Sequence, residues 1–170
     1  MKSLFSFPNP VNEVAARTVA AGVVLMAVVA LVFELPWMLI PLTYGFWARV
    51  LTGPTLSPLG QLATRVVAPA LPFAERLTPG PPKRCAQAIG ATLTTAACIV
   101  FLTLGWGAAA WLLAALVVAA FLESALGLCL GCKMFALLMR LGVIPASVCE
   151  ECGDLSRRHP ALREQRGATV

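Results

Sequence analysis

The sequence predicts an all-α integral membrane protein whose four transmembrane helices form two antiparallel hairpins. Three observations predict this class. Of the 170 residues, 59% are hydrophobic and only 12% are charged, which is far more apolar than an average soluble domain. Four stretches approach the roughly 20 apolar residues that a helix needs to cross a bilayer. No Lys or Arg lies at the centre of any of these stretches, so each can lie in hydrocarbon.

The predicted spans cover residues 14–33, 35–51, 86–104 and 108–128. Ahead of the first span, residues 1–13 are expected to lie at the cytoplasmic membrane surface, because their prolines and asparagines favour turns. Asn12 is expected to cap the first helix, since its side chain can accept a hydrogen bond from an amide of the first turn. The spans together define a membrane domain over residues 14–141, which is followed by a basic, cysteine-containing cytoplasmic tail over residues 142–170.

The segment between the second and third spans, residues 52–84, contains seven prolines. They exclude a long helix and therefore a fifth span. Over residues 58–71, apolar residues occur among polar ones in a pattern that would give a helix one apolar and one polar face. This pattern predicts a short amphipathic helix in the membrane interface. The proline-rich run at residues 79–82 predicts a rigid turn that leads to Lys83 and Arg84, which would anchor the third span at the headgroups.

The third and fourth spans are joined by the short sequence Gly-Trp-Gly at residues 105–107, which predicts that these two spans are antiparallel neighbours. Gly127 and Gly131 form a GxxxG pair near the end of the fourth span. Such a pair permits close contact with a helix of the same bundle or, alternatively, with a second copy of the chain in a homo-oligomer.

The basic residues predict the orientation of the chain, because cytoplasmic loops carry an excess of Lys and Arg. Two basic residues precede or open the first span, five lie at or between the second and third, and six follow the fourth. Both ends are therefore expected in the cytoplasm, with the helices in the cytoplasmic membrane. The net charge of +5 fits attraction to the anionic headgroups of the lipid bilayer. Because no basic stripe interleaves with aromatic residues, we expect no nucleic-acid partner.

The cysteines are the chemically informative residues. Four of the six form two CxxC pairs, Cys129 with Cys132 and Cys149 with Cys152. Both pairs are expected on the cytoplasmic side, where reducing conditions disfavour permanent disulfides. The pairs therefore indicate reactive thiol chemistry or metal binding, unless they are simply small apolar residues in packed segments.

In the thiol interpretation, Cys129 and Cys132 are a catalytic dithiol that exchanges electrons or sulfane sulfur. Lys133 favours the thiolate of Cys132, which makes Cys132 the expected nucleophile and Cys129 the resolving partner. In the metal interpretation, one zinc ion is held by four thiolates, because two CxxC pairs can close a tetrahedron. Its ligands would be Cys129, Cys132, Cys149 and Cys152. The first pair is expected on a helix that continues from the fourth span as far as Leu141.

Glu123 is the acidic residue of the predicted spans, and an ionisable residue inside a membrane is by default a candidate for function. It lies one or two helical turns before Cys129. It could take part in proton transfer with the thiols. Alternatively, it could form an ion pair with Lys or Arg at the cytoplasmic interface.

Three segments occur together in this chain: FPNPVNE at residues 7–13, GPPKRCAQ at 80–87 and GLCLGCK at 127–133. In combination they resemble an uncharacterised integral-membrane family, a domain of unknown function common in actinobacteria, over about residues 5–141. Members of that family are often encoded beside a thioredoxin-like protein and a rhodanese-type sulfurtransferase. The resemblance implies thiol or sulfane-sulfur metabolism, and it marks GLCLGCK as the candidate site.

The expected function is therefore thiol–disulfide or sulfane-sulfur exchange at the cytoplasmic membrane face, with a thioredoxin-like or rhodanese-type partner. Two alternatives remain open. One is a non-enzymatic membrane subunit or scaffold that contains a structural zinc site. The other is a small transporter for a sulfur compound.

Overall fold

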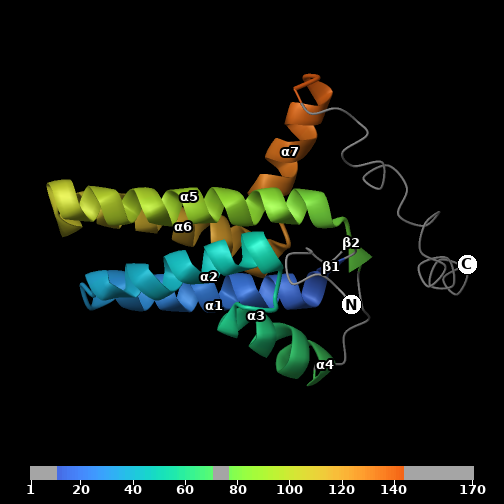
Figure 1. Ribbon diagram of the computed structural model, residues 1–170, viewed down its shortest axis with the longest axis horizontal. Coiled ribbons are helices and arrows are strands. Elements are labelled where there is room, and N and C mark those ends of the chain that lie inside the picture. Colours follow the sequence, from blue (N-terminus) through green and yellow to red (C-terminus); the bar gives the residue numbers. More distant parts are fainter. Residues whose placement is uncertain (1–10, 71–76, 144–170) are drawn as a thin grey trace, which may run out of the picture.

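The computed structural model describes residues 11–70 and 77–143. Most of these residues are helical, and three of the described helices are long and apolar enough to cross a membrane: α1 (Glu13–Val32), α5 (Gly80–Leu104) and α6 (Trp106–Leu126). A shorter helix, α2 (Leu39–Thr52), lies alongside them (Figure 1). The prediction of an α-helical chain with apolar helices of membrane-spanning length is thus confirmed.

The first two helices begin close to where the sequence predicts. The amide of Val14 donates a 2.9 Å hydrogen bond to Oδ1 of Asn12, which confirms the predicted N-cap of α1. After α1, a 3₁₀ turn, η1 (Pro36–Met38), leads into α2. The 14 residues of α2 extend about 21 Å at 1.5 Å per residue, which is less than the full thickness of a bilayer core.

The third long helix begins earlier than expected. The prolines at 79–82 were predicted to form a turn, and this prediction is wrong, because α5 starts at Gly80. Pro81 and Pro82 occupy the first turn of the helix, where a missing amide hydrogen costs nothing and the fixed backbone angle suits the helix. The consequence is that Lys83 and Cys85 lie within α5 and not ahead of it.

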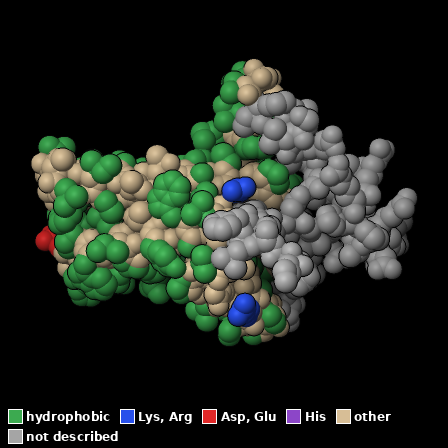
Figure 2. All heavy atoms as spheres, in the orientation of Figure 1, with side chains coloured by type: hydrophobic (Ala, Val, Ile, Leu, Met, Phe, Trp, Pro, Cys, Tyr) green, Lys and Arg blue, Asp and Glu red, His purple; other side chains and the backbone are tan. Residues whose placement is uncertain are grey.

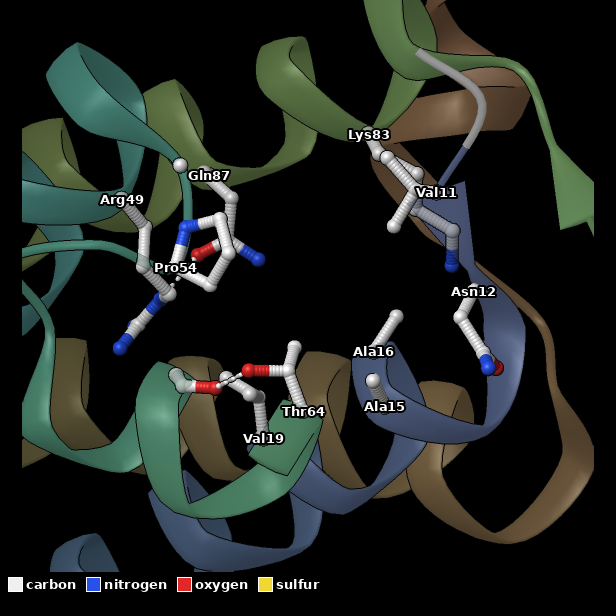
Figure 3. A pocket seen from close by; sticks show the side chains of 12 residues that line it. Val11, Asn12, Ala15, Ala16, Val19, Arg49, Pro54, Thr64, Lys83 and Gln87 are labelled. Carbon is white, nitrogen blue, oxygen red and sulfur yellow. Dashed lines mark hydrogen bonds between the residues drawn. The ribbon is translucent and has the colours of Figure 1, made fainter. Parts of the chain in front are cut away.

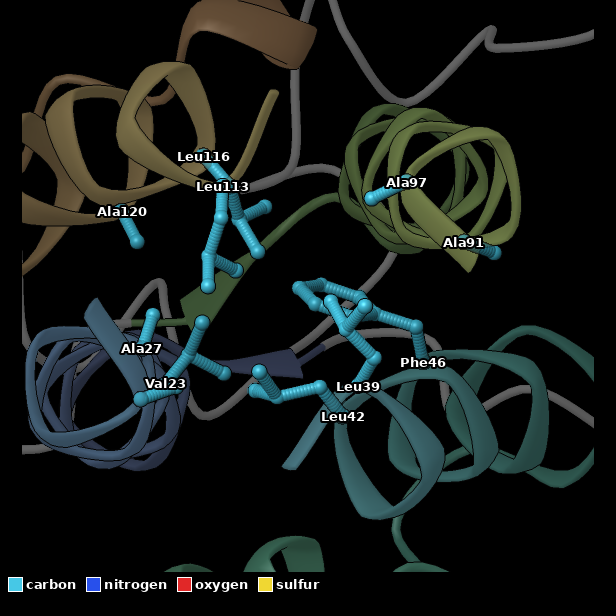
Figure 4. Packing of buried hydrophobic residues seen from close by; sticks show 11 residues of the cluster. Val23, Ala27, Leu39, Leu42, Phe46, Ala91, Ala97, Leu113, Leu116 and Ala120 are labelled. Atoms are coloured by element: carbon cyan, nitrogen blue, oxygen red, sulfur yellow. The ribbon is translucent and has the colours of Figure 1, made fainter. Parts of the chain in front are cut away.

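The core lies between four helices. α1 packs chiefly against α6, and α5 packs against both α2 and α6. Small residues such as Ala27, Ala30 and Ala109 are completely buried, which allows the helix backbones to approach closely. Larger side chains fill the centre of the bundle, including Leu39, Leu42, Phe46, Leu113 and Leu116, as Figure 4 shows in a view along the helices.

The outer surface of the bundle is apolar. Figure 2 shows hydrophobic side chains over most of its visible face, with the Lys and Arg side chains toward the end from which α7 (Leu130–Arg140) departs. Leu102 and Trp111 are about four-fifths exposed. A soluble protein rarely exposes such a continuous apolar surface, so this surface fits contact with lipid.

Short elements cover the opposite side of that same end of the bundle. The segment after α2 forms α3 (Pro58–Leu62), a π-helical turn η2 (Ala63–Val67) and α4 (Ala68–Ala70), so residues 58–70 are helical as predicted. A two-stranded antiparallel pairing joins β1 (Val11–Asn12) to β2 (Leu77–Thr78), with Val11 opposite Thr78. These contacts hold the start of α1 next to the start of α5 (Figure 1).

Candidate thiol site

The candidate site begins where α6 ends, at Gly127. This glycine adopts a left-handed conformation with φ of +67°, and its amide donates to the carbonyls of Glu123 and Leu122. Glycine is the residue that adopts this conformation at least cost, and it commonly terminates helices. The predicted fourth span continued to residue 128 and onward into one long helix. The structure instead has a break, and Gly127 and Gly131 lie on different elements.

Arg17 of α1 holds this helix end in place. Its Nε donates to the carbonyl of Ser124 at 3.1 Å, and its Nη2 donates to the carbonyl of Ala125 at 2.9 Å. Both carbonyls lie in the last turn of α6, where no intrahelical amide is available to them. A positive charge at this position also complements the negative end of the helix dipole. The break after α6 is therefore fixed from a distant part of the sequence.

Cys129 is the N-cap residue of the next helix, α7. Its backbone is extended, with φ of −81° and ψ of 105°, and its Sγ accepts a hydrogen bond from the amide of Cys132 at 3.4 Å. The side chain of Cys129 is buried and that of Cys132 is partly exposed. A sulfur at a helix N-terminus faces unpaired amides and the positive end of the dipole, and both favour a thiolate.

Gly131 brings this helix start against α5. A Cβ at this position would overlap the backbone and side chain of Ala86. Only glycine therefore permits the contact. The contact places the dithiol close to Lys83, three residues before Ala86 on the same helix.

Lys83 forms an ion pair with Glu123 of α6. Its Nζ lies 2.7 Å from Oε1 of the carboxylate, and the two side chains are only 8% and 13% exposed. Of the two roles considered for Glu123, the structure shows the ion pair. Sequence reasoning took Lys83 for a headgroup anchor and missed this contact, because the two partners lie 40 residues apart.

The pKa values of the two thiols are shifted in opposite directions. The pKa of Cys129 is lowered because its sulfur accepts hydrogen bonds from the Cys132 thiol and amide and because Lys83 is near, although burial and Glu123 oppose this. The pKa of Cys132 is raised, chiefly because its proton is held by Cys129 and because it is partly buried. Cys129 is therefore the thiol that ionises first. This geometry favours the thiolate at Cys129, whereas the sequence, on the basis of Lys133, favours it at Cys132.

A cavity of about 390 Å³ opens beside the dithiol. Cys129, Cys132 and Lys83 line it together with Glu13 and the apolar side chains of Phe135 and Met139. It is large enough to admit a small thiol compound or the tip of a polypeptide loop, because a water molecule takes up only about 30 Å³. The thiols are thus accessible from a defined pocket.

Lys83 also lines a second cavity, of about 170 Å³. In Figure 3, Arg49 and Gln87 lie at one end of this cavity, and Lys83 lies with Val11 at the other. Arg49 is only 5% exposed, and its Nε donates to Oε1 of Gln87 at 2.7 Å. Arg49 and Lys83 are therefore two buried cations on neighbouring helices.

The guanidinium of Arg49 is otherwise only partly paired. Its Nη1 donates to the hydroxyl of Ser57 at 3.1 Å, and its Cζ lies 4.6 Å from the centre of the Phe46 ring. Its Nη2 has no hydrogen-bond partner among the described residues. Sequence reasoning also missed Arg49. The available signal was a basic residue close to the end of a predicted span, where a charge needs a partner.

Among the described residues, Cys85 and Cys98 do not complete a metal site with Cys129 and Cys132. Cys149 and Cys152 lie outside the described residues, so the four-thiolate zinc site stays a prediction. Within residues 11–70 and 77–143, no group of three or more Cys, His, Asp or Glu side chains could hold a metal ion. Cys98 lies in α5, 3.5 Å from the hydroxyl of Thr43, as a packed residue.

Fold and site together define an α-helical protein with apolar helices of membrane-spanning length and a CxxC dithiol at the start of the helix that follows them. The chain belongs to the DUF4395 family, a domain of unknown function, which it matches over residues 11–140. The resemblance to a domain of unknown function is thus confirmed. The matched region includes Cys129 and Cys132 and ends before Cys149 and Cys152. The chain matches no curated protein and no solved structure.

Proposed function

We propose that the protein is a four-span protein of the cytoplasmic membrane that exchanges electrons or sulfane sulfur through Cys129 and Cys132. The observation that carries the proposal is the place of Cys129 at the N-cap of α7, where its Sγ accepts the Cys132 amide. A cysteine that only fills space in a packed helix does not need this geometry. A nucleophilic cysteine gains from it, because the amide and the helix dipole stabilise its thiolate.

The membrane part of the proposal rests on the surface and on the charges. The three long helices are apolar, and the exposed side chains of α2 include Ile40, Tyr44 and Trp47, which suit contact with lipid. α2 together with η1 would form the second span, which brings the number of spans to four. Arg17, Arg49 and Lys83 gather at the end of the bundle that carries the dithiol, so the positive-inside rule supports a cytoplasmic position for the thiols and both chain ends.

The exchange reaction begins with the Cys129 thiolate. It attacks one sulfur of a partner disulfide, forms a mixed disulfide and releases the other sulfur as a thiolate. The Cys132 thiol then gives its proton to that thiolate and attacks Sγ of Cys129, which frees the partner's second sulfur. The partner gains two electrons, and Cys129 and Cys132 become a disulfide. For sulfane sulfur, the same thiolate attacks the terminal sulfur of a partner persulfide and takes it over, leaving the partner as a thiolate.

The partner in this proposal is a cytoplasmic thioredoxin-like or rhodanese-type protein. Such a partner would have to bring its reactive sulfur into the 390 Å³ cavity beside Cys129 and Cys132. Lys83 would hold the attacking sulfur in its ionised form, and Glu123 would keep the lysine in place.

The proposal is tested by trapping the mixed disulfide. Full-length protein in nanodiscs is mixed with oxidised thioredoxin, both with the native tail and with Cys149 and Cys152 changed to Ser. The Cys132→Ser variant is expected to accumulate a mixed disulfide, because the resolving thiol is missing. The Cys129→Ser variant is expected to form none, and Cys98→Ser serves as the control. Exchange by Cys129→Ser at the rate of the unmodified protein would refute the proposal.

Metal analysis of the same samples distinguishes the zinc scaffold. One zinc per chain that is lost when either CxxC pair is changed to Ser would favour a structural site. In that case the thiols would be protected from alkylation until the metal is removed. Cysteine pairs that cycle between oxidised and reduced forms without metal would favour exchange.

A further inference from the structure

α7 leaves the bundle at a steep angle to the other helices (Figure 1). One face of this helix is both apolar and exposed. Leu130, Met134, Leu137 and Leu141 recur at a spacing of three or four residues, and each is between 43% and 66% exposed. At 100° per residue these side chains fall within about 60° of arc. They form one stripe, which we call the α7 stripe.

The other faces of α7 have different neighbours. Gly131 and Phe135 are buried and lie on the face that packs against α5. Lys133 and Arg140 are exposed and lie on the opposite flank of the α7 stripe. The helix therefore has three faces in sequence around its axis: packed, apolar and exposed, and basic.

We propose that α7 lies flat in the headgroup region of an anionic bilayer, with the α7 stripe toward the acyl chains. A short helix with an apolar face and flanking basic residues is the kind that binds in the interface plane. Lys133 and Arg140 can extend to lipid phosphates while their stems cover apolar surface. The steep angle between α7 and the bundle places it along the membrane surface when the bundle crosses the membrane. The inference rests on the membrane location in the proposed function.

A second copy of the chain is a weaker candidate for covering the α7 stripe. The stripe comprises four side chains, whereas a stable protein interface uses about 20–30 residues from each partner. A lipid surface needs no such area, because the long apolar helices already hold the protein in place. Contact between copies is therefore treated as an outcome of the test.

The position of α7 also determines the position of the dithiol. Cys129 is the N-cap of α7, so a helix fixed at the headgroups holds the thiols at that depth as well. A partner would then have to approach along the membrane surface. The exchange reaction does not require this, since a helix pointing into the cytoplasm could carry the same thiols.

The test measures the depth of single positions in nanodiscs. An environment-sensitive fluorescent amino acid is introduced genetically, with all native cysteines kept, at Leu137 in the α7 stripe, at Ala136 outside it, or at Leu102 in α5. Lipids brominated on their acyl chains quench fluorophores that contact the hydrocarbon. We expect the fluorophore to be quenched at positions 137 and 102. At Ala136, which lies about 130° from the centre of the stripe, we expect the quenching to be weaker by a factor of about two or more.

The outcomes separate the inference from the proposed function. Quenching at Leu102 without quenching at Leu137 would leave the membrane location standing and overturn the position of α7. No quenching at either site would overturn both. Protection of Leu137 that depends on protein concentration would assign the stripe to a second copy instead. In nanodiscs of phosphatidylcholine, adding phosphatidylglycerol is expected to increase the quenching at Leu137, and Lys133→Gln with Arg140→Gln is expected to remove that increase.

Discussion

The buried charges give a quantitative prediction, because two cations share one carboxylate. Glu123 lies 2.7 Å from Lys83 and also interacts electrostatically with Arg49. Two unit charges at this distance attract each other by about 6 kcal/mol at an effective dielectric constant of about 20, before the cost of desolvation. The three buried groups together carry a charge of +1. Changing Glu123 to Gln raises this to +2, whereas changing Lys83 to Met lowers it to zero.

The Glu123→Gln variant should therefore lose about 3–5 kcal/mol of unfolding free energy, which is typical of breaking a buried pair. Lys83→Met should lose less, because Arg49 still interacts with the carboxylate. The double variant should be more stable than Glu123→Gln, since it removes the second uncompensated cation. Reversible unfolding in mixed micelles measures all three, and Glu34→Gln, at an exposed residue, is the control. A loss at Glu123→Gln no larger than at Lys83→Met would refute the reasoning.

Two further predictions concern the helix that carries the thiols. Gly131→Ala should cost about 1–3 kcal/mol of stability, because the added methyl overlaps Ala86. Gly107→Ala is the control and should be neutral, because nothing lies within 4 Å of a Cβ at that position. Equal shifts of the thermal unfolding midpoint in the two variants would contradict this prediction. Alkylation of Cys129 should rise through a midpoint below that of an ordinary cysteine, because its pKa is lowered and the thiolate fraction grows as pH rises through the pKa. Cys132→Ala should move that midpoint to higher pH by removing the thiol hydrogen bond, and iodoacetamide labelling with mass spectrometry measures it; an unchanged midpoint would count against the assignment.

The apolar helices could be predicted from the sequence because their signal is local. The expected first span, residues 14–33, differs from α1 by one residue at each end, and the expected fourth span begins and ends within two residues of α6. A long apolar run can be recognised in the sequence without knowing which residues pack against it. The start of α5 was missed because consecutive prolines suit both a turn and the first turn of a helix. In the structure they form the first turn of α5.

The candidate site was predicted only in its residue types. The CxxC sequence identified Cys129 and Cys132, but Lys83 reaches the site from α5. Arg49 of α2 lines the neighbouring cavity, together with Lys83. A sequence pattern carries no information about contacts between residues 40 positions apart. Such residues can be found in a sequence only by asking which buried charge needs a partner. A basic residue near the end of a predicted span should prompt a search for its carboxylate, and Glu123 is the only acidic residue within the four predicted spans.

The choice of nucleophile depends on where α6 ends, and the apolar pattern of the sequence does not indicate that point. If the helix continued through Gly127, the Cys132 amide would bond to the carbonyl of residue 128, and neither thiol would occupy an N-cap. Because Gly127 turns the backbone to φ of +67° and Arg17 binds the carbonyls at the end of α6, Cys129 adopts an extended backbone and accepts the amide of Cys132. Lys133 then follows the pair in sequence without deciding its chemistry. The acidity of the dithiol is thus set by where one helix stops, and that point is fixed jointly by a glycine and by an arginine more than 100 residues earlier.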